Sequence, residues 1–238
     1  MPTIEYSDGS TTFEGYIAVP QLTPTPRACI LIAHAWDGLN IHWIDMAEHF
    51  AARGFVALAI DVYGKGIRGR VDGDNSELMN PLLENRGELL KRLRAAFEFA
   101  IARDDVDEDR VVMLGHCFGG LCALDLARAS PKGLRGAIAV HSPLTPSDIF
   151  ETNKISASVL VLHGWADPVA PPHDVLTFAA EMSAAGADWQ LHAYGHAMHA
   201  FTFVGADIPA LGIKYDANAH RRSQHAIEQF LAETLGRP

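Results

Sequence analysis

Short, continuously apolar runs alternate with longer amphipathic segments along most of this chain. Most of the apolar runs have the length of strands and lack polar positions, as is typical of strands covered on both faces. We predict strands at residues 11–19, 28–33, 55–60, 110–114, 135–140, 159–162 and 189–194, and helices at 41–53, 84–103, 118–129, 172–185 and 217–235. This alternation predicts an α/β protein with a mainly parallel, twisted sheet and helices on both faces.

Three connecting segments have compositions that predict loops. Residues 21–27 hold two prolines, which predicts a turn. Residues 62–81 are rich in Gly, Asp and Asn and lack periodicity, which predicts a long loop of a kind that is often functional. The acidic run at 104–109 predicts a solvated loop before the next strand. No change of composition marks a linker and no repeat is present, so we expect a single domain over residues 1–238.

The composition excludes several classes of protein. Hydrophobic residues make up 48% of the chain and charged residues 20%, which is typical of a globular protein. The formal net charge of −10 argues against nucleic acid or an anionic membrane as a partner. The first ten residues do not resemble a secretory signal, and no apolar run approaches the roughly 18 residues of a membrane span. Three cysteines make no disulfide framework, so we expect a cytoplasmic protein, and no spacing predicts a metal or cofactor site.

One motif carries a specific chemical prediction. The segment Gly115-His116-Cys117-Phe118-Gly119 lies between a predicted strand and a predicted helix. A sharp turn there needs small residues on both sides of its apex, and it holds the apex side chain at the start of a helix, where a thiolate is favoured. The motif therefore predicts Cys117 as a nucleophile, the alternative being a buried cysteine in a glycine-rich turn.

A nucleophile of this kind needs a base, and the base needs an acid that orients it. Asp167 follows the strand predicted at 159–162, and His199 follows the strand predicted at 189–194. Their order along the chain, nucleophile then acid then base, is the order expected when the nucleophile occupies such a turn. His196 is an alternative base, because it lies only three residues before His199.

These segments together resemble the dienelactone hydrolase family of α/β-hydrolases. The resemblance rests on G-x-C-x-G-G at 115–120, H-G-x-x-D-P at 163–168, H-A-F at 199–201 and D-x-Y at 61–63. It implies an α/β-hydrolase fold, with the nucleophile at Cys117, the acid at Asp167 and the base at His199. It also implies an oxyanion hole made by the backbone N–H groups of Phe118 and Trp36.

The chain departs from the family pattern at two places. The family's dienelactone-cleaving members carry a glutamate at the position matching Ala35, and an arginine shortly after the base, where this chain continues as Ala200-Phe201-Thr202-Phe203. Dienelactone itself is therefore not the expected substrate. The cations available to replace the arginine are Lys65, Arg68 and Arg70, in the loop predicted at 62–81.

Several further side chains fall near the predicted site. We expect Asp37, Tyr63, His141 and Trp165 to contact substrate, because they lie at or just after the carboxyl ends of strands. The alternatives are a loop role for His141 and core packing for Tyr63 and Trp165. For Asp37 a helix cap is an equally good interpretation. His34 and His116 are expected to hydrogen-bond loop backbone, Asp61 to stabilise a turn, and Cys29 and Cys122 to be inert buried thiols.

The leading hypothesis is hydrolysis of a small-molecule carboxylic ester or lactone through a covalent thioester on Cys117. The alternative is a protein without catalysis on the same scaffold, which binds a ligand or senses oxidants through Cys117.

Overall fold

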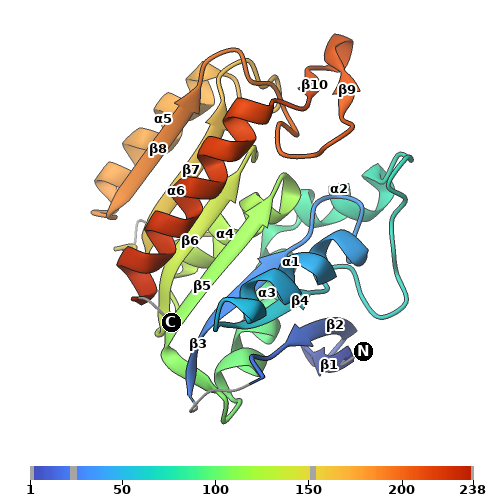
Figure 1. Ribbon diagram of the computed structural model, residues 1–238, viewed down its shortest axis with the longest axis vertical. Helices are drawn as coiled ribbons and strands as arrows, with labels where there is room; N and C mark the ends of the chain where they lie inside the picture. The colour runs from blue at the N-terminus through green and yellow to red at the C-terminus, as the bar shows by residue number, and fades with distance from the viewer. Residues whose placement is uncertain (1–2, 22–25, 151–153, 237–238) are drawn as a thin grey trace.

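The computed structural model describes residues 3–21, 26–150 and 154–236. Its centre is an eight-stranded sheet with the strand order β1-β2-β4-β3-β5-β6-β7-β8 (Figure 1). The strands from β3 to β8 run parallel, and β1 and β2 are antiparallel additions at one edge. The strand bounds are Thr3–Ser7 (β1), Thr12–Ala18 (β2), Arg27–Ala33 (β3), Val56–Ile60 (β4), Val106–His116 (β5), Leu134–Val140 (β6), Ser158–Gly164 (β7) and Trp189–Tyr194 (β8).

Helices cover both faces of this sheet, so the predicted fold class is confirmed. On one face lie α1 (Ile41–Ala52) and α6 (Ala217–Leu235) (Figure 1). On the other lie α3 (Arg86–Ile101), α4 (Phe118–Ala129) and α5 (Pro172–Ala184), with α2 (Ser76–Glu84) directly before α3. Among the described residues, no helix has the length and apolar character that a membrane crossing requires.

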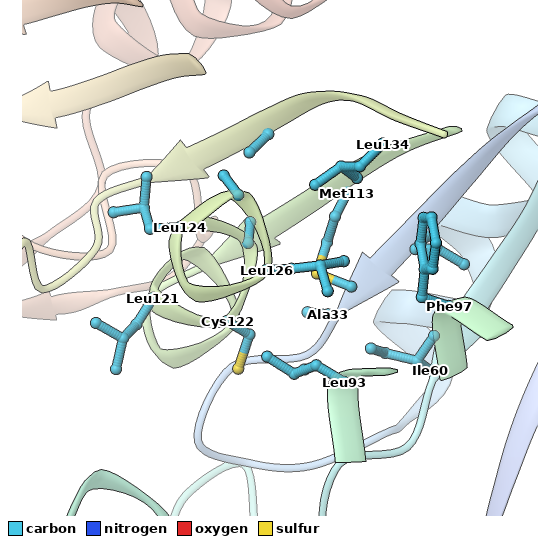
Figure 2. Packing of buried hydrophobic residues seen from close by; sticks show 14 of the residues in the cluster. Ala33, Ile60, Leu93, Phe97, Met113, Leu121, Cys122, Leu124, Leu126 and Leu134 are labelled. Atoms are coloured by element: carbon cyan, nitrogen blue, oxygen red, sulfur yellow. The ribbon is translucent and has the colours of Figure 1, made fainter. Parts of the chain in front are cut away.

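Each face of the sheet carries its own apolar core, which explains why successive residues of the central strands are apolar over most of their length. In β3, Ile30 and Ile32 face the α1 and α6 side, whereas Cys29 and Leu31 face the α3 and α4 side, and all four are fully buried. Figure 2 shows the second of these cores, where Cys122 of α4 lies among aliphatic side chains near Leu93. Burial raises the pKa of the Cys122 thiol, so this cysteine is not a candidate nucleophile.

The structure corrects the prediction of a loop over residues 62–81. The loop ends at Asn75, and the segment from Ser76 to Glu84 forms the helix α2. Its apolar residues follow a helical spacing and pack on the core, but Pro81 and the polar residues between them hide the pattern. Asn85 then separates α2 from α3 by accepting a hydrogen bond from the Glu88 N–H, so the helix predicted from residue 84 begins at Arg86.

Other element boundaries also differ from the prediction. β5 begins at Val106, so part of the acidic run belongs to a strand and not to a loop. The pairing of β5 with β3 has a register shift between Arg27 and Cys29. The strand β1 and the small pair β9 (Asp207–Ile208) and β10 (Ile213–Lys214) were not predicted, because they are short and largely exposed. Residues 22–25 of the predicted turn lie outside the described residues.

The turn between β5 and α4 is pressed against the end of β3. A Cβ on Gly115 would lie 1.9 Å from the Gly119 carbonyl oxygen, and a Cβ on Gly119 would lie 2.1 Å from that of Ala33. Both contacts are with backbone, which has no room to move. Only glycine therefore fits at these two positions, and this turn holds residue 117 above the carboxyl edge of the sheet.

We expect Gly119→Ala to lower the free energy of unfolding by about 3 kcal/mol, because the added methyl group must displace β3. Gly195→Ala is the matched control, since nothing lies within 4 Å of a Cβ placed there. Its unfolding free energy should change by less than about 1 kcal/mol. Urea unfolding followed by circular dichroism measures both, and equal midpoints for the two variants would contradict the packing argument.

Candidate active site

Cys117 occupies the apex of the turn between β5 and α4 in a conformation that a non-glycine residue seldom adopts. Its φ is 53° and its ψ is −120°. Three backbone hydrogen bonds hold it there: its N–H donates to the Val140 carbonyl at 2.9 Å, and its own carbonyl accepts from the Gly120 N–H at 3.0 Å and the Leu121 N–H at 3.3 Å. Strain of this kind persists only where the surrounding structure enforces it, and here it leaves the thiol half-buried beside the first turn of α4.

The structure brings the three side chains predicted from separate motifs into one hydrogen-bonded chain. His199 Nε2 lies 3.1 Å from Cys117 Sγ, and His199 Nδ1 lies 2.8 Å from Asp167 Oδ2. Asp167 is buried and is held in turn by the Val169 N–H, 2.8 Å from its other carboxylate oxygen. Because the carboxylate accepts the Nδ1 proton, Nε2 is the nitrogen that faces the thiol.

His196, the alternative base, lies elsewhere. Its side chain is exposed and has no hydrogen bond within the described part of the chain. In the turn after β8, residue 196 has a positive φ of 67°. The geometry therefore favours His199 as the partner of Cys117.

The charges around His199 favour its protonated form. Burial alone would lower the pKa of His199, but the neighbouring Cys117 sulfur and Asp167 carboxylate outweigh it and raise this pKa to about 10. A histidine with this pKa stays positively charged at neutral pH. The arrangement can therefore hold a thiolate beside an imidazolium, with the carboxylate on the far side of the ring.

The backbone of His199 is held from both sides by the segment that carries β9 and β10. The His199 N–H donates to the Gly212 carbonyl at 2.8 Å, and its carbonyl accepts from the Lys214 N–H at 3.1 Å. Residue 199 thus forms a one-residue parallel bridge with Ile213. Nothing in the sequence pattern of residues 204–214 indicated this support, since the segment is short and exposed.

The two predicted oxyanion donors lie on segments that touch each other. The Phe118 N–H is at the first position of α4, where no helical carbonyl is available to it. The loop that carries Trp36 begins at the end of β3, and a Cβ on Gly119 would lie 2.7 Å from the His34 carbonyl oxygen of that loop. Within the described residues, neither the Phe118 nor the Trp36 N–H has a hydrogen-bond partner.

Two of the predicted substrate contacts have structural partners instead. Tyr63 is buried, stacks on the Phe118 ring and donates its hydroxyl proton to the Trp36 carbonyl at 2.9 Å. His141 is fully buried behind His199, with the two ring centroids 5.1 Å apart and its Nε2 2.8 Å from the Thr202 hydroxyl. Its backbone has a positive φ of 36°, and burial lowers the pKa of its ring well below the usual value. His141 therefore packs against His199 and does not reach the surface, and no motif in the sequence indicated its partner Thr202.

Asp37 is half-buried, whereas Trp165 is exposed. One Asp37 oxygen accepts from the Asn40 amide at 2.6 Å, and Asn40 itself caps α1 by accepting from the His42 N–H. Asp37 is therefore not the helix cap, and its other oxygen is buried with no partner in the described residues. Trp165, on the loop after β7, is 46% exposed.

Three further residues named from the sequence are His34, His116 and Asp61, and their contacts differ. His34 bonds loop backbone as predicted, whereas the His116 ring has no hydrogen bond within the described residues and packs against Trp43 and Phe203. Burial lowers the pKa of His116 to about 3. Asp61 accepts from the Tyr63 and Gly64 N–H groups and so stabilises the turn after β4, as expected.

The three cations of the loop after β4 are already paired at other places. Lys65 forms an ion pair with Glu5 on β1. Arg68 lies 3.5 Å from Asp61 and 3.4 Å from Glu14, and Arg70 lies 3.5 Å from Asp72 near the tip of the loop. The structure gives no support to the idea that one of them replaces the family's arginine.

A nucleophile turn at the carboxyl edge of a mostly parallel sheet, with an acid and a base on later loops, defines an α/β-hydrolase. The sequence model of the dienelactone hydrolase family matches residues 13–235, so the chain belongs to that family. It is accordingly a hydrolase, and the family supports an ester or lactone as the substrate.

Individual relatives agree with this assignment. The solved structure of a dienelactone hydrolase-like promiscuous phosphotriesterase from metagenomic libraries has a TM-score of 0.92 and 31% identity, and covers 99% of this chain and 98% of that one. An uncharacterised protein of Caenorhabditis elegans, K02A2.1, is 38% identical over 154 residues, which are 64% of this chain and 98% of that protein. A Yersinia pestis protein that carries the name carboxymethylenebutenolidase is 26% identical over 196 residues, 78% of this chain and 73% of its own.

We expect the rate of Cys117 alkylation by iodoacetamide to be flat between about pH 6.5 and 9. The pKa of His199, raised to about 10, keeps the ring charged over this whole range, so the charge that faces the Cys117 sulfur at 3.1 Å does not change with pH. His199→Ala is the matched control and should convert the flat profile into a rate that rises with pH. A wild-type profile with one rise centred near 8.5, the value of a free cysteine, would contradict the ion pair.

Proposed function

We propose that this hydrolase cleaves small, neutral carboxylic esters or lactones by covalent catalysis, with Cys117 as nucleophile, His199 as base and acid, and Asp167 as the residue that orients His199. The proposal rests above all on the hydrogen-bonded chain from Asp167 through His199 to Cys117, placed at a strained turn beside a helix N-terminus.

In acylation the Cys117 thiolate attacks the carbonyl carbon, and the carbonyl electron pair moves onto its oxygen. The N–H groups of Phe118 and Trp36, which have no other partner in the described residues, receive this oxyanion. One such donor is worth about 3 kcal/mol in the transition state. The intermediate collapses, the C–O bond breaks, and the Nε2 proton of His199 passes to the leaving oxygen. The product of this step is a thioester on Cys117.

In deacylation the neutral His199 takes a proton from water, and the resulting hydroxide attacks the thioester carbonyl. A second oxyanion forms in the same hole, and its collapse breaks the C–S bond. Cys117 leaves as a thiolate beside the imidazolium, which restores the starting pair. Asp167 holds the ring in the required tautomer and stabilises its charge in both steps.

The charges near the site favour a neutral substrate. Lys65, Arg68 and Arg70 are paired with carboxylates elsewhere, whereas Asp37, next to Trp36, keeps one carboxylate oxygen without a partner among the described residues. None of these three cations is free to bind a substrate carboxylate, the charge of His199 is balanced by Cys117 and Asp167, and Asp37 would repel a second carboxylate. A neutral phosphotriester is a second candidate substrate, because the same nucleophile and N–H donors suit its tetrahedral centre and a relative of 31% identity carries that name.

We expect Cys117→Ala to lower kcat/KM for p-nitrophenyl butyrate by about 1000-fold or more, since the covalent route is lost. The matched control is Cys122→Ala, whose thiol is buried in the core between α3 and α4, and its kcat/KM should stay within about threefold. Mass spectrometry of the acylated wild type should show the butyryl group on Cys117. Unchanged activity in Cys117→Ala, with ester still bound, would favour the non-catalytic alternative.

We expect p-nitrophenyl pentanoate to be cleaved at least tenfold more efficiently than p-nitrophenyl hemisuccinate, which carries a carboxylate on an acyl chain of similar length. A repulsion of about 1–2 kcal/mol between the substrate carboxylate and Asp37 accounts for a tenfold ratio of kcat/KM. Asp37→Asn removes the charge of residue 37. It should raise kcat/KM for the hemisuccinate more than for the pentanoate, and so lower the ratio between the two esters. Equal rates for the two esters in the wild type would overturn the preference for neutral substrates.

A further inference from the structure

His34 is a fully buried ring held between two backbone groups. Its Nε2 lies 3.1 Å from the Val62 backbone nitrogen, and its Nδ1 lies 2.7 Å from the Ala35 carbonyl oxygen. A backbone N–H can only donate, so Nε2 accepts and carries no proton. Nδ1 therefore carries the proton and donates it to the Ala35 carbonyl. The two bonds fix one tautomer and one orientation of the ring.

The ring is also held in its neutral form. Burial lowers the pKa of His34 and outweighs the hydrogen bond to Ala35 and the nearby carboxylates, which act in the opposite direction. A neutral ring with Nδ1 protonated is the only form that satisfies both backbone partners, because a charged ring would place a second donor against the Val62 N–H.

The carbonyl that His34 binds belongs to the same peptide unit as the Trp36 N–H. Such a unit is planar and trans, so its C=O and N–H point in opposite directions. The Ala35 carbonyl accepts from His34 on one side and from the Gly38 N–H at 3.2 Å. These two bonds set the plane of the unit and leave the Trp36 N–H on its other side, with no partner among the described residues.

We propose that His34 is a positioning residue for the oxyanion hole, acting through the Ala35–Trp36 peptide. Its Nδ1–H holds the plane of that peptide and, by drawing electron density onto the Ala35 oxygen, makes the Trp36 N–H a stronger donor. The inference rests on the proposed function, in which the Trp36 N–H receives the oxyanion. Since the oxyanion exists only after attack, His34 acts on kcat and has little effect on KM.

Two substitutions separate this role from simple packing. In His34→Asn the side-chain amide nitrogen falls near the position of Nδ1, so the bond to the Ala35 carbonyl is kept and the bond from Val62 is lost. In His34→Gln the amide oxygen falls near the position of Nε2, so the Val62 bond is kept and the Ala35 bond is lost. Each variant loses one buried hydrogen bond, so both should show similar reductions of the urea midpoint.

We expect His34→Gln to lower kcat for p-nitrophenyl butyrate between 10-fold and 100-fold with KM within about threefold, and His34→Asn to keep kcat within about threefold. The rate of Cys117 alkylation by iodoacetamide should stay near the wild-type rate in both, because displacement of iodide forms no oxyanion. A purely structural role would lower kcat and the alkylation rate together, or lower kcat equally in the two variants, and either result would overturn the proposal.

The controls distinguish this inference from the proposed function itself. If Cys117→Ala keeps wild-type activity, the covalent mechanism fails whatever the His34 variants do. If Cys117→Ala is inactive and His34→Gln retains the wild-type kcat, only the role of His34 fails. If His34→Gln does not fold, His34→Asn still decides, because a tenfold loss of kcat in a folded variant that keeps the Ala35 bond contradicts the proposal.

Discussion

The contact between the β5–α4 turn and the end of β3 is the constraint on which the site depends. Gly119 lies so close to the Ala33 and His34 carbonyls that no side chain fits between them. This contact places the strained backbone of Cys117 and the loop after β3 side by side, and these two segments carry the thiol and both N–H donors of the proposed mechanism. One backbone-to-backbone approach thus sets the relative position of groups that are about 80 residues apart in the chain.

Burial lowers the pKa of each histidine around this turn, but the net shift of the pKa differs because their partners differ. His199 has a carboxylate on one side and a sulfur on the other, and the pKa of its ring rises to about 10 despite burial. Among the described residues, His116 and His141 contact neither a carboxylate nor a sulfur through a hydrogen bond, and burial lowers the pKa of each. A cluster of similar rings therefore contains one that favours positive charge, next to rings that stay neutral and do not compete for the proton.

The sequence predicted the fold class and the family, because continuous apolar strands and the glycines around Cys117 have few alternative explanations. It also selected Cys117, Asp167 and His199, which the structure places in hydrogen-bond contact, while their catalytic roles stay predictions. It missed α2, since Pro81 interrupts the pattern, and it assigned Tyr63 and His141 to the substrate although both support other residues. A position just after a strand indicates at which edge of the sheet a residue lies. It does not indicate whether the side chain faces the substrate side or the interior of the protein.

The bridge between His199 and Ile213 has a consequence for how this site can vary. It closes residues 200–212 into a loop whose two ends are held next to each other by the hydrogen bonds of Gly212 and Lys214 to His199. The entropy of closing such a loop grows only slowly with its length. Insertions and exchanges around the exposed Val204 and Ile208 can therefore accumulate with little effect on the position of His199. The fold in this way separates a segment that tolerates changes of length and sequence from the backbone that holds His199.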